Sequence, residues 1–103
     1  MLVQMSFAEF QTSIAQEKFP AGLSPALQAL WHDAADDWSK AHACVQDDDS
    51  REGAWVHAYL HRKEGDQGNA RYWYSRANRP PVDAAVPLAE EWAQLARALI
   101  GGN

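Results

Sequence analysis

Apolar residues recur every three or four positions along most of the chain, which is the spacing of an α-helix with one buried face. The first such stretch begins at the capping-box pair Ser6 and Glu9 and ends at residues 19–22, which include Pro and Gly. The second has Pro25 as its first helical residue, and its apolar spacing continues to Val45. The pattern therefore predicts one continuous helix between these two residues.

Three more helices are predicted after residue 45, each with its own start and stop signals. The expected first and last residues are Asp49 and Gly65, Asp66 and Asn78, and Pro87 and the pair Gly101–Gly102. Residues 79–86 form the one linker-like stretch. No alternating run of β-branched residues and no Asn-Gly or Asp-Gly turn indicates a strand. We therefore expect an all-α fold of about five helices, in a single domain that spans residues 1–103.

The connections between the second, third and fourth predicted helices are short. Because a few connecting residues cannot cross a domain, consecutive helices are expected to pack antiparallel. The many Ala residues and five Trp residues indicate close-packed helices, since an Ala face accepts large rings from its neighbours. The sequence thus predicts a small bundle of antiparallel helical hairpins, with a core that includes Trp31, Trp38, Trp55, Trp73 and Trp92.

The charge and composition of the chain exclude several classes of partner. Nine Lys and Arg residues against fourteen Asp and Glu residues give a formal net charge of -5, which is poorly suited to phosphate backbones, so nucleic acid is not expected. No apolar run is long enough to cross a bilayer, and the first residues carry no signal-peptide pattern, so a membrane location is not expected. Cys44 is a single cysteine and cannot form an internal disulfide. A cytoplasmic location is therefore expected.

Two segments of the chain resemble known families. Residues 66–77, with the sequence DQGNARYWYSRA, are similar to the second helix of a Sel1-type tetratricopeptide repeat, whose pattern places Asp, Ala, a Trp-Tyr pair and a basic-Ala pair at this spacing. The longer block HAYLHRKEGDQGNARYWYSRA, residues 57–77, resembles a family of short all-helical proteins with no established activity. The first resemblance implies a helical-hairpin scaffold. The second implies a compact helical fold and no catalytic assignment.

Three residues of the third predicted helix have side chains suited to metal binding. His57, His61 and Glu64 follow one another at intervals of about one turn, so they project from roughly one helical face. Two imidazoles and a carboxylate are a known ligand set for zinc or a related divalent metal. The chain has no HExxH motif and no Cys pair, and the alternative is that these histidines line a polar seam between helices.

A fourth candidate ligand comes from the second predicted helix. Folding that helix back on the third pairs residues whose numbers sum to roughly 97 to 99. This register places His42 near Trp55 or His57, and Trp38 and Asp37 near His61. His42 can then complete a metal site, or a poised general base, with His57, His61 and Glu64, while Asp37 orients one imidazole. Alternatively, His42 only hydrogen-bonds a carboxylate or carbonyl across the hairpin.

Basic and aromatic residues cluster in the third and fourth predicted helices, although the chain is acidic overall. The three consecutive aromatic residues 72–74 cannot all face the core, so Tyr72 is expected to point to a neighbour or a partner. Exposed aromatic rings beside Arg are common in interfaces. A solvated basic face that pairs with nearby acids explains the cluster equally well. The candidate contact residues are Arg62, Asn69, Arg71, Tyr72 and Arg76.

The sequence supports two functional hypotheses of different classes. The first is a module that binds a protein, a peptide or a second copy of the chain through the basic and aromatic face. The alternative is a small metal- or ligand-binding protein, or an enzyme, in which His42, His57, His61 and Glu64 hold a divalent metal. No Gly-rich phosphate loop and no G-x-S-x-G motif is present, so no common enzyme motif indicates a particular reaction.

Overall fold

The computed structural model describes residues 5–101, and these residues form α-helices and no strand. The helices are α1 (Phe7–Ala15), α2 (Pro25–Ala34), α3 (Trp38–Val45), α4 (Arg51–Glu64), α5 (Gln67–Arg76) and α6 (Leu88–Gly101). The predicted all-α class is confirmed, but this part of the chain contains six helices rather than five. Of the two glycines expected to end the last helix, Gly101 is the final residue of α6 and Gly102 lies outside the described residues.

The extra helix arises because the predicted helix from Pro25 to Val45 is wrong. It is divided into α2 and α3 at residues 35–37. Asp36 has a left-handed backbone with φ of 66°, and the Asp37 carboxylate accepts a hydrogen bond from the Lys40 N–H at 3.1 Å, which caps α3. Short polar side chains compete with helical hydrogen bonds in this way. The apolar spacing does not show the break, because α2 and α3 both bury a face in the same core.

Most of the other helix boundaries follow their capping signals. The end of α1 does not: the helix ends at Ala15, before the predicted stop at residues 19–22, and Glu17 has a left-handed backbone with φ of 56°. Ser6 and Glu9 form the predicted capping box at the start of α1. The cap of α4 is Ser50, one residue beyond the expected Asp49, and its hydroxyl accepts a hydrogen bond from the Gly53 N–H at 3.0 Å. Gly65 ends α4 in a left-handed conformation with φ of 90°, which Gly adopts without steric cost. Each of these boundaries is therefore explained by a local hydrogen bond or a local dihedral angle.

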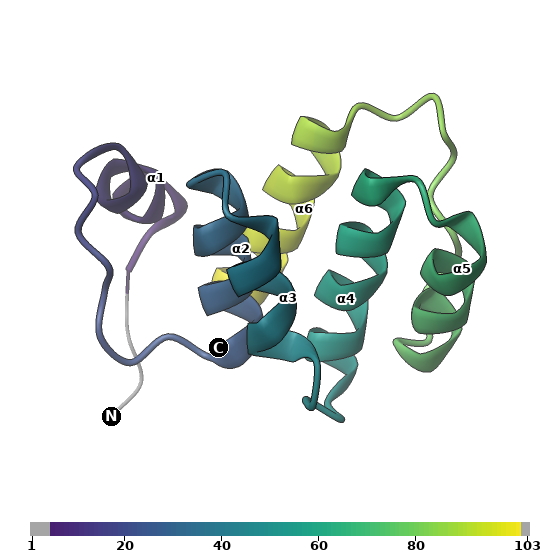
Figure 1. Ribbon diagram of the computed structural model, residues 1–103. Coiled ribbons are helices and arrows are strands. Elements are labelled where there is room, and N and C mark those ends of the chain that lie inside the picture. Colours follow the sequence, from purple (N-terminus) through teal and green to yellow (C-terminus); the bar gives the residue numbers. More distant parts are fainter. Residues whose placement is uncertain (1–4, 102–103) are drawn as a thin grey trace.

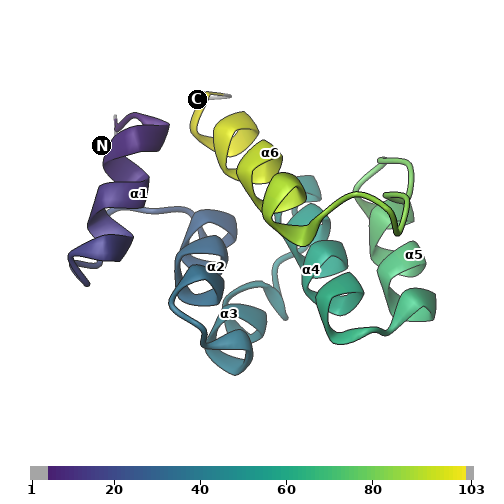
Figure 2. The ribbon, with the colours of Figure 1, turned by 90° about the horizontal axis from the view of Figure 1, so that it is seen from above.

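The helices pack as a row of neighbours with one helix lying across them. Helices α2, α3, α4 and α5 follow one another side by side, and α4 and α5 form a hairpin at one end of the molecule (Figure 1). Helix α6 packs on α1, α2 and α4, so it joins α1 to the row and lies across α2 and α4 (Figure 2). The molecule measures 33 × 24 × 22 Å along its principal axes. Within residues 5–101, no helix combines the length and the apolar character needed to cross a bilayer.

Two hydrophobic clusters form the core of the described residues. The larger joins α1, α2, α3, α4 and α6, and its fully buried members include Phe10, Leu30, Val45, Val56, Leu60 and Leu95. The smaller lies between α4 and α5 and is built from Ala58, Ala70 and Tyr74. The small Ala side chains allow the two helices to approach closely.

The tryptophans lie at the margin of this core more than in it. Trp31 is buried, whereas the other four are partly buried and pack against the clusters. Three indole N–H groups find acceptors there, as a partly buried indole requires: Trp31 donates to Ser13, Trp38 to the Leu60 carbonyl and Trp92 to the Leu30 carbonyl. The predicted aromatic core is thus confirmed for Trp31 and only in part for the rest.

Candidate metal centre

Three histidines converge where α3 packs against α4. His42 comes from α3, and His57 and His61 lie one turn apart on α4. One ring nitrogen of each lies within 4.8 Å of the corresponding nitrogens of the other two, and Nε2 of His42 and Nε2 of His57 are 3.0 Å apart. The predicted register placed His42 near Trp55 or His57, and the structure shows that it lies beside His57. The register holds despite the break in the chain at residues 35–37, because the break precedes α3.

Aromatic stacking fixes the orientation of two of the three imidazoles. The Trp73 ring stacks on His57 with 4.0 Å between centroids and an interplanar angle of 13°, and the Trp38 ring stacks on His42 at 4.9 Å and 13°. Trp38 is itself held by the hydrogen bond from its indole N–H to the Leu60 carbonyl. Side chains locked by packing and hydrogen bonds give a site its preorganised geometry.

The surroundings lower the pKa of two of these histidines. His57 is 4% exposed, and its pKa is lowered to about 4 by burial and by the neighbouring His42 and His61. The pKa of His42 is also lowered, chiefly by burial and then by His61. A neutral imidazole has a free lone pair, which is the form that binds a metal ion.

His57 carries an unsatisfied polar atom. Among the described residues, its Nδ1 is buried and has no hydrogen-bond partner. A buried polar atom without a partner costs about 1 to 3 kcal/mol, so its presence calls for a compensating role. An apolar residue would fill the same space between Trp73 and α3 without that cost. The unpaired Nδ1 is distinct from Nε2, which faces His42, so an ion bound at Nε2 would leave this cost in place.

The two carboxylates proposed near the histidines have different positions. Oε2 of Glu64 lies 3.2 Å from Nδ1 of His61, and Glu64 groups with His61 and Asp66 rather than with the three histidines. Asp37 caps α3 and is not part of the histidine group, contrary to the expectation that it would orient an imidazole. The carboxylate that contacts an imidazole is Glu64, which lies next to Nδ1 of His61.

The spacing of the histidine nitrogens suits a transition metal ion. Two nitrogen ligands at about 2.0 to 2.1 Å from a tetrahedral zinc ion lie about 3.3 Å apart. The separation of 3.0 Å between Nε2 of His42 and Nε2 of His57 is close to this value, and it is also the length of a hydrogen bond between the two rings. The three nitrogens lie within 4.8 Å of one another, so the group has to close around an ion. Imidazole ligands suit zinc, copper, nickel and iron, whereas magnesium and calcium prefer oxygen ligands.

Four of the five predicted contact residues lie on the exposed face of α5. Asn69, Arg71, Tyr72 and Arg76 are all exposed, and Tyr72 is 52% exposed as expected. The Arg76 guanidinium lies over the Tyr72 ring and donates a hydrogen bond to its hydroxyl oxygen at 3.0 Å. This arrangement keeps an aromatic ring and a cation together at the surface.

Arg62 does not belong to this face, and its predicted exposure is wrong. It is 7% exposed, and Nη1 donates to Oε1 of Glu91 at 2.8 Å, while Nη2 donates to the Val86 carbonyl. Tyr74 donates to the second oxygen of Glu91. The signal that could have revealed the pair is Glu91 itself, which falls within the apolar stripe of α6, where a carboxylate needs a buried partner.

Asp33 is a second buried carboxylate that the sequence did not predict. Asp33 on α2 accepts hydrogen bonds from the Tyr59 hydroxyl at 2.6 Å and from the Lys63 ammonium at 2.8 Å. Both donors come from α4, so this group ties α2 to α4 in the same way that Glu91 ties α6 to α4. These contacts are structural, because every polar atom in them has a partner within the protein.

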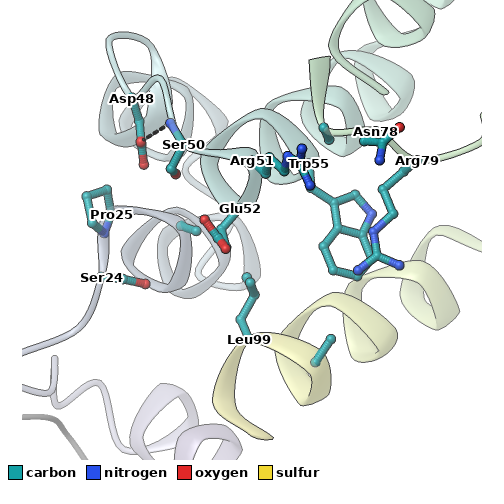
Figure 3. A pocket seen from close by; sticks show the side chains of 13 residues that line it. Ser24, Pro25, Asp48, Ser50, Arg51, Glu52, Trp55, Asn78, Arg79 and Leu99 are labelled. Carbon is teal, nitrogen blue, oxygen red and sulfur yellow. Dashed lines mark hydrogen bonds between the residues drawn. The ribbon is translucent and has the colours of Figure 1, made fainter. Parts of the chain in front are cut away.

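The structure also contains an open groove that the sequence did not suggest. It has a volume of about 770 Å³ and lies between the start of α2, the start of α4, the residues that follow α5 and the C-terminal half of α6 (Figure 3). The Arg79 guanidinium stacks on the Trp55 ring there, 3.9 Å from its centroid. Its charged lining residues, Asp48, Arg51, Glu52 and Arg79, are of both signs and select no particular ligand.

A scan against models of protein families gives no match, and searches of curated proteins and of solved structures find no protein similar to this chain. The chemistry of the site must therefore be inferred from its own residues.

Proposed function

We propose that this protein binds one divalent transition metal ion through His42, His57 and His61. The observation that carries the proposal is the convergence of three imidazole nitrogens within 4.8 Å, from two different helices. The low pKa of His57 supports the proposal, because a neutral imidazole keeps the lone pair that binds a metal ion. Zinc is the ion that best suits three imidazoles without a redox requirement.

The experiment is elemental analysis of untagged protein purified without chelator, together with calorimetric titration of zinc into chelated protein. We expect about one zinc ion per chain, and its loss when His42→Ala and His57→Ala are combined. His32→Ala is the matched control, because His32 lies on α2 and stacks on Phe19, outside the histidine group. It should keep the full metal content.

Two results would contradict the proposal. One is the absence of saturable zinc binding by the unaltered protein. The other is metal binding that survives in the double variant, because the ion would then be held elsewhere. A loss of metal in the control His32→Ala would point to unspecific binding by exposed histidines.

The exposed face of α5 favours a second candidate function, an interaction module. We propose that Asn69, Arg71, Tyr72 and Arg76 bind an acidic protein or peptide, since this face is basic on a chain of net charge -5. A second copy of the same acidic chain is the simplest such partner. The exposed Tyr72 beside Arg76 supports this, as does the similarity of residues 66–77 to the second helix of a Sel1-type repeat, a tetratricopeptide-like hairpin scaffold.

Sedimentation equilibrium over a range of protein concentrations tests self-association. Combining Arg71→Ala with Tyr72→Ala should then shift the protein to monomer, whereas Gln67→Ala, an exposed position at the start of the same helix, should not. If the unaltered protein stays monomeric at high concentration, a second copy of the chain is excluded as the partner. If acidic peptides capture neither the unaltered protein nor the Arg71→Ala, Tyr72→Ala variant, binding of an acidic partner by this face is excluded.

A further inference from the structure

The arrangement around the histidines carries an inference about the coordination of the metal, which rests on the proposed function. We infer that an ion held by His42, His57 and His61 keeps one coordination position open, and that this position takes water or a small anion. Glu64 is a positioning residue that acts through His61, and it does not coordinate the ion.

The number of available ligands is the first observation. Within residues 5–101, the group that includes His42 and His57 contains three residues, and none of them is a carboxylate or a cysteine. Zinc in proteins is usually four-coordinate. Structural zinc sites fill all four positions with protein ligands, whereas sites with three protein ligands bind water or substrate in the fourth. Three protein ligands are available here, as in the zinc sites that bind water or substrate in the fourth position.

The position of Glu64 is the second observation. Its carboxylate contacts Nδ1 of His61 at 3.2 Å, which leaves Nε2 of that ring as the nitrogen free to bind an ion. A histidine that binds a metal through one nitrogen commonly donates its other N–H to a carboxylate, which fixes the ring and makes the ligand more basic. Glu64 therefore has the geometry of such a partner, on the side of His61 away from an ion.

The exposure of the group is the third observation. His57 is buried, while His42 and His61 are only partly so, which places the group at the surface with His57 as its innermost member. The flanking Trp38 and Trp73 stack on imidazole rings, and an indole offers no lone pair for a metal ion. An exogenous ligand can thus approach from solvent without displacing a protein ligand.

The charge of the group indicates which ligand the open position prefers. An imidazole ligand carries no negative charge, so three of them leave the full double charge of the ion uncompensated, and a small anion is attracted to it. Glu64 is 39% exposed, and solvent weakens its influence on the ion. Small monodentate anions such as azide are therefore suitable probes.

The test uses the full chain loaded with cobalt(II), whose visible absorption reports on coordination. Azide should shift the cobalt bands in a saturable manner, while the cobalt content stays at about one per chain. A chain that binds no cobalt would contradict the proposed function. A chain that keeps its cobalt but whose bands do not respond to azide would overturn the inference of an open position and leave the proposed function intact.

Glu64→Gln separates a positioning role from a ligand role. For a positioning residue, we expect the cobalt affinity to fall by about 10- to 100-fold, with the azide response retained at saturating cobalt and the melting temperature in chelator unchanged. Glu52→Gln, at the exposed start of the same helix, is the matched control and should keep full affinity. An azide response that is absent in the unaltered protein and appears only in Glu64→Gln would show that Glu64 is the fourth ligand, and would overturn the inference.

Discussion

Arg62 and Glu91 form the most deeply buried ion pair among the described residues. Glu91 is 1% exposed, and its two oxygens accept hydrogen bonds from Arg62 and from the Tyr74 hydroxyl. The second guanidinium nitrogen of Arg62 donates to the Asp83 and Val86 carbonyls. Both charges are thus supplied with partners, which is the condition under which a buried pair is tolerated.

Removing one member of this pair should be costly. We expect Arg62→Ala to lower the free energy of unfolding by about 3 to 5 kcal/mol, because Glu91 is left buried without its counter-charge. Urea unfolding measured by Trp fluorescence checks this. Arg71→Ala, an exposed arginine on α5, should change stability by no more than about 0.5 kcal/mol. A loss of similar size in both variants would mean that Arg62 contributes no more than a surface residue.

The low pKa of His57 predicts how stability depends on pH in metal-free protein. The folded state has a pKa of about 4 at this residue, and the unfolded state has about 6.5. Between these values the unfolded chain binds a proton that the folded chain does not, so stability is lost as pH falls through this range. The loss from His57 alone reaches about 3 kcal/mol near pH 4.

Chelated protein and its His57→Leu variant, unfolded in urea at about pH 7 and about pH 4.5, measure this contribution. The variant should lose less stability on acidification than the unaltered protein, because carboxylates and the other histidines titrate in both. Equal pH dependence of the two proteins would show that His57 titrates normally in the folded state.

At the scale of elements, the break between α2 and α3 depends on the backbone of Asp36. Its φ of 66° is unfavourable for a residue with a Cβ atom and neutral for Gly. We expect Asp36→Gly to be neutral or stabilising, and Asp36→Ala to destabilise by about 1 kcal/mol. In one continuous helix the order would be reversed, since Ala is favoured over Gly by about 1 kcal/mol. Comparing the melting temperatures of Asp36→Gly and Asp36→Ala therefore distinguishes a break at Asp36 from one continuous helix.

The elements also show which boundaries a sequence can predict. A capping box, a Pro at the first helical position and a Gly at the end act through bonds and dihedral angles within a few residues, so the start of α1 and the end of α4 were predictable. The end of α2 carries no Gly or Pro. Asp36 and Asp37 are compatible with a helix as well as with a turn, and packing of α3 against α4 selects the turn.

At the scale of the whole molecule, a bound metal ion would join α3 to α4. Because the three ligands are assembled only in the folded state, zinc should stabilise the whole domain by mass action. At a free zinc concentration 100 times the dissociation constant, the gain is about 2.7 kcal/mol. For a domain of this size this raises the melting temperature by roughly 10 °C or more.

Thermal unfolding with zinc, and again after excess chelator, checks this prediction. The rise should be reversed by the chelator and should be absent when His42→Ala and His57→Ala are combined. A melting temperature that does not respond to zinc would show that the ion does not bind preferentially to the folded chain.

Features that depend on short-range chemistry could be predicted from the amino-acid sequence alone. These are the all-α class, several helix boundaries, the exposure of Tyr72, and the placement of His42 near Trp55 or His57, which follows from a short loop and a fixed helical rise. Each is set by residues close together in the chain, where capping bonds, helical spacing and loop length leave few alternatives.

Only the tertiary structure decided the features that depend on residues far apart. The burial of Arg62 requires Glu91 on α6, and the role of Asp33 requires Tyr59 and Lys63 on α4. Glu64 lies behind His61 because of the side-chain orientation within the last turn of α4, which helical spacing alone does not distinguish from a ligand position. A charged residue has the same local signature whether it is solvated or paired in the interior, and only the packing of distant helices determines which of the two applies.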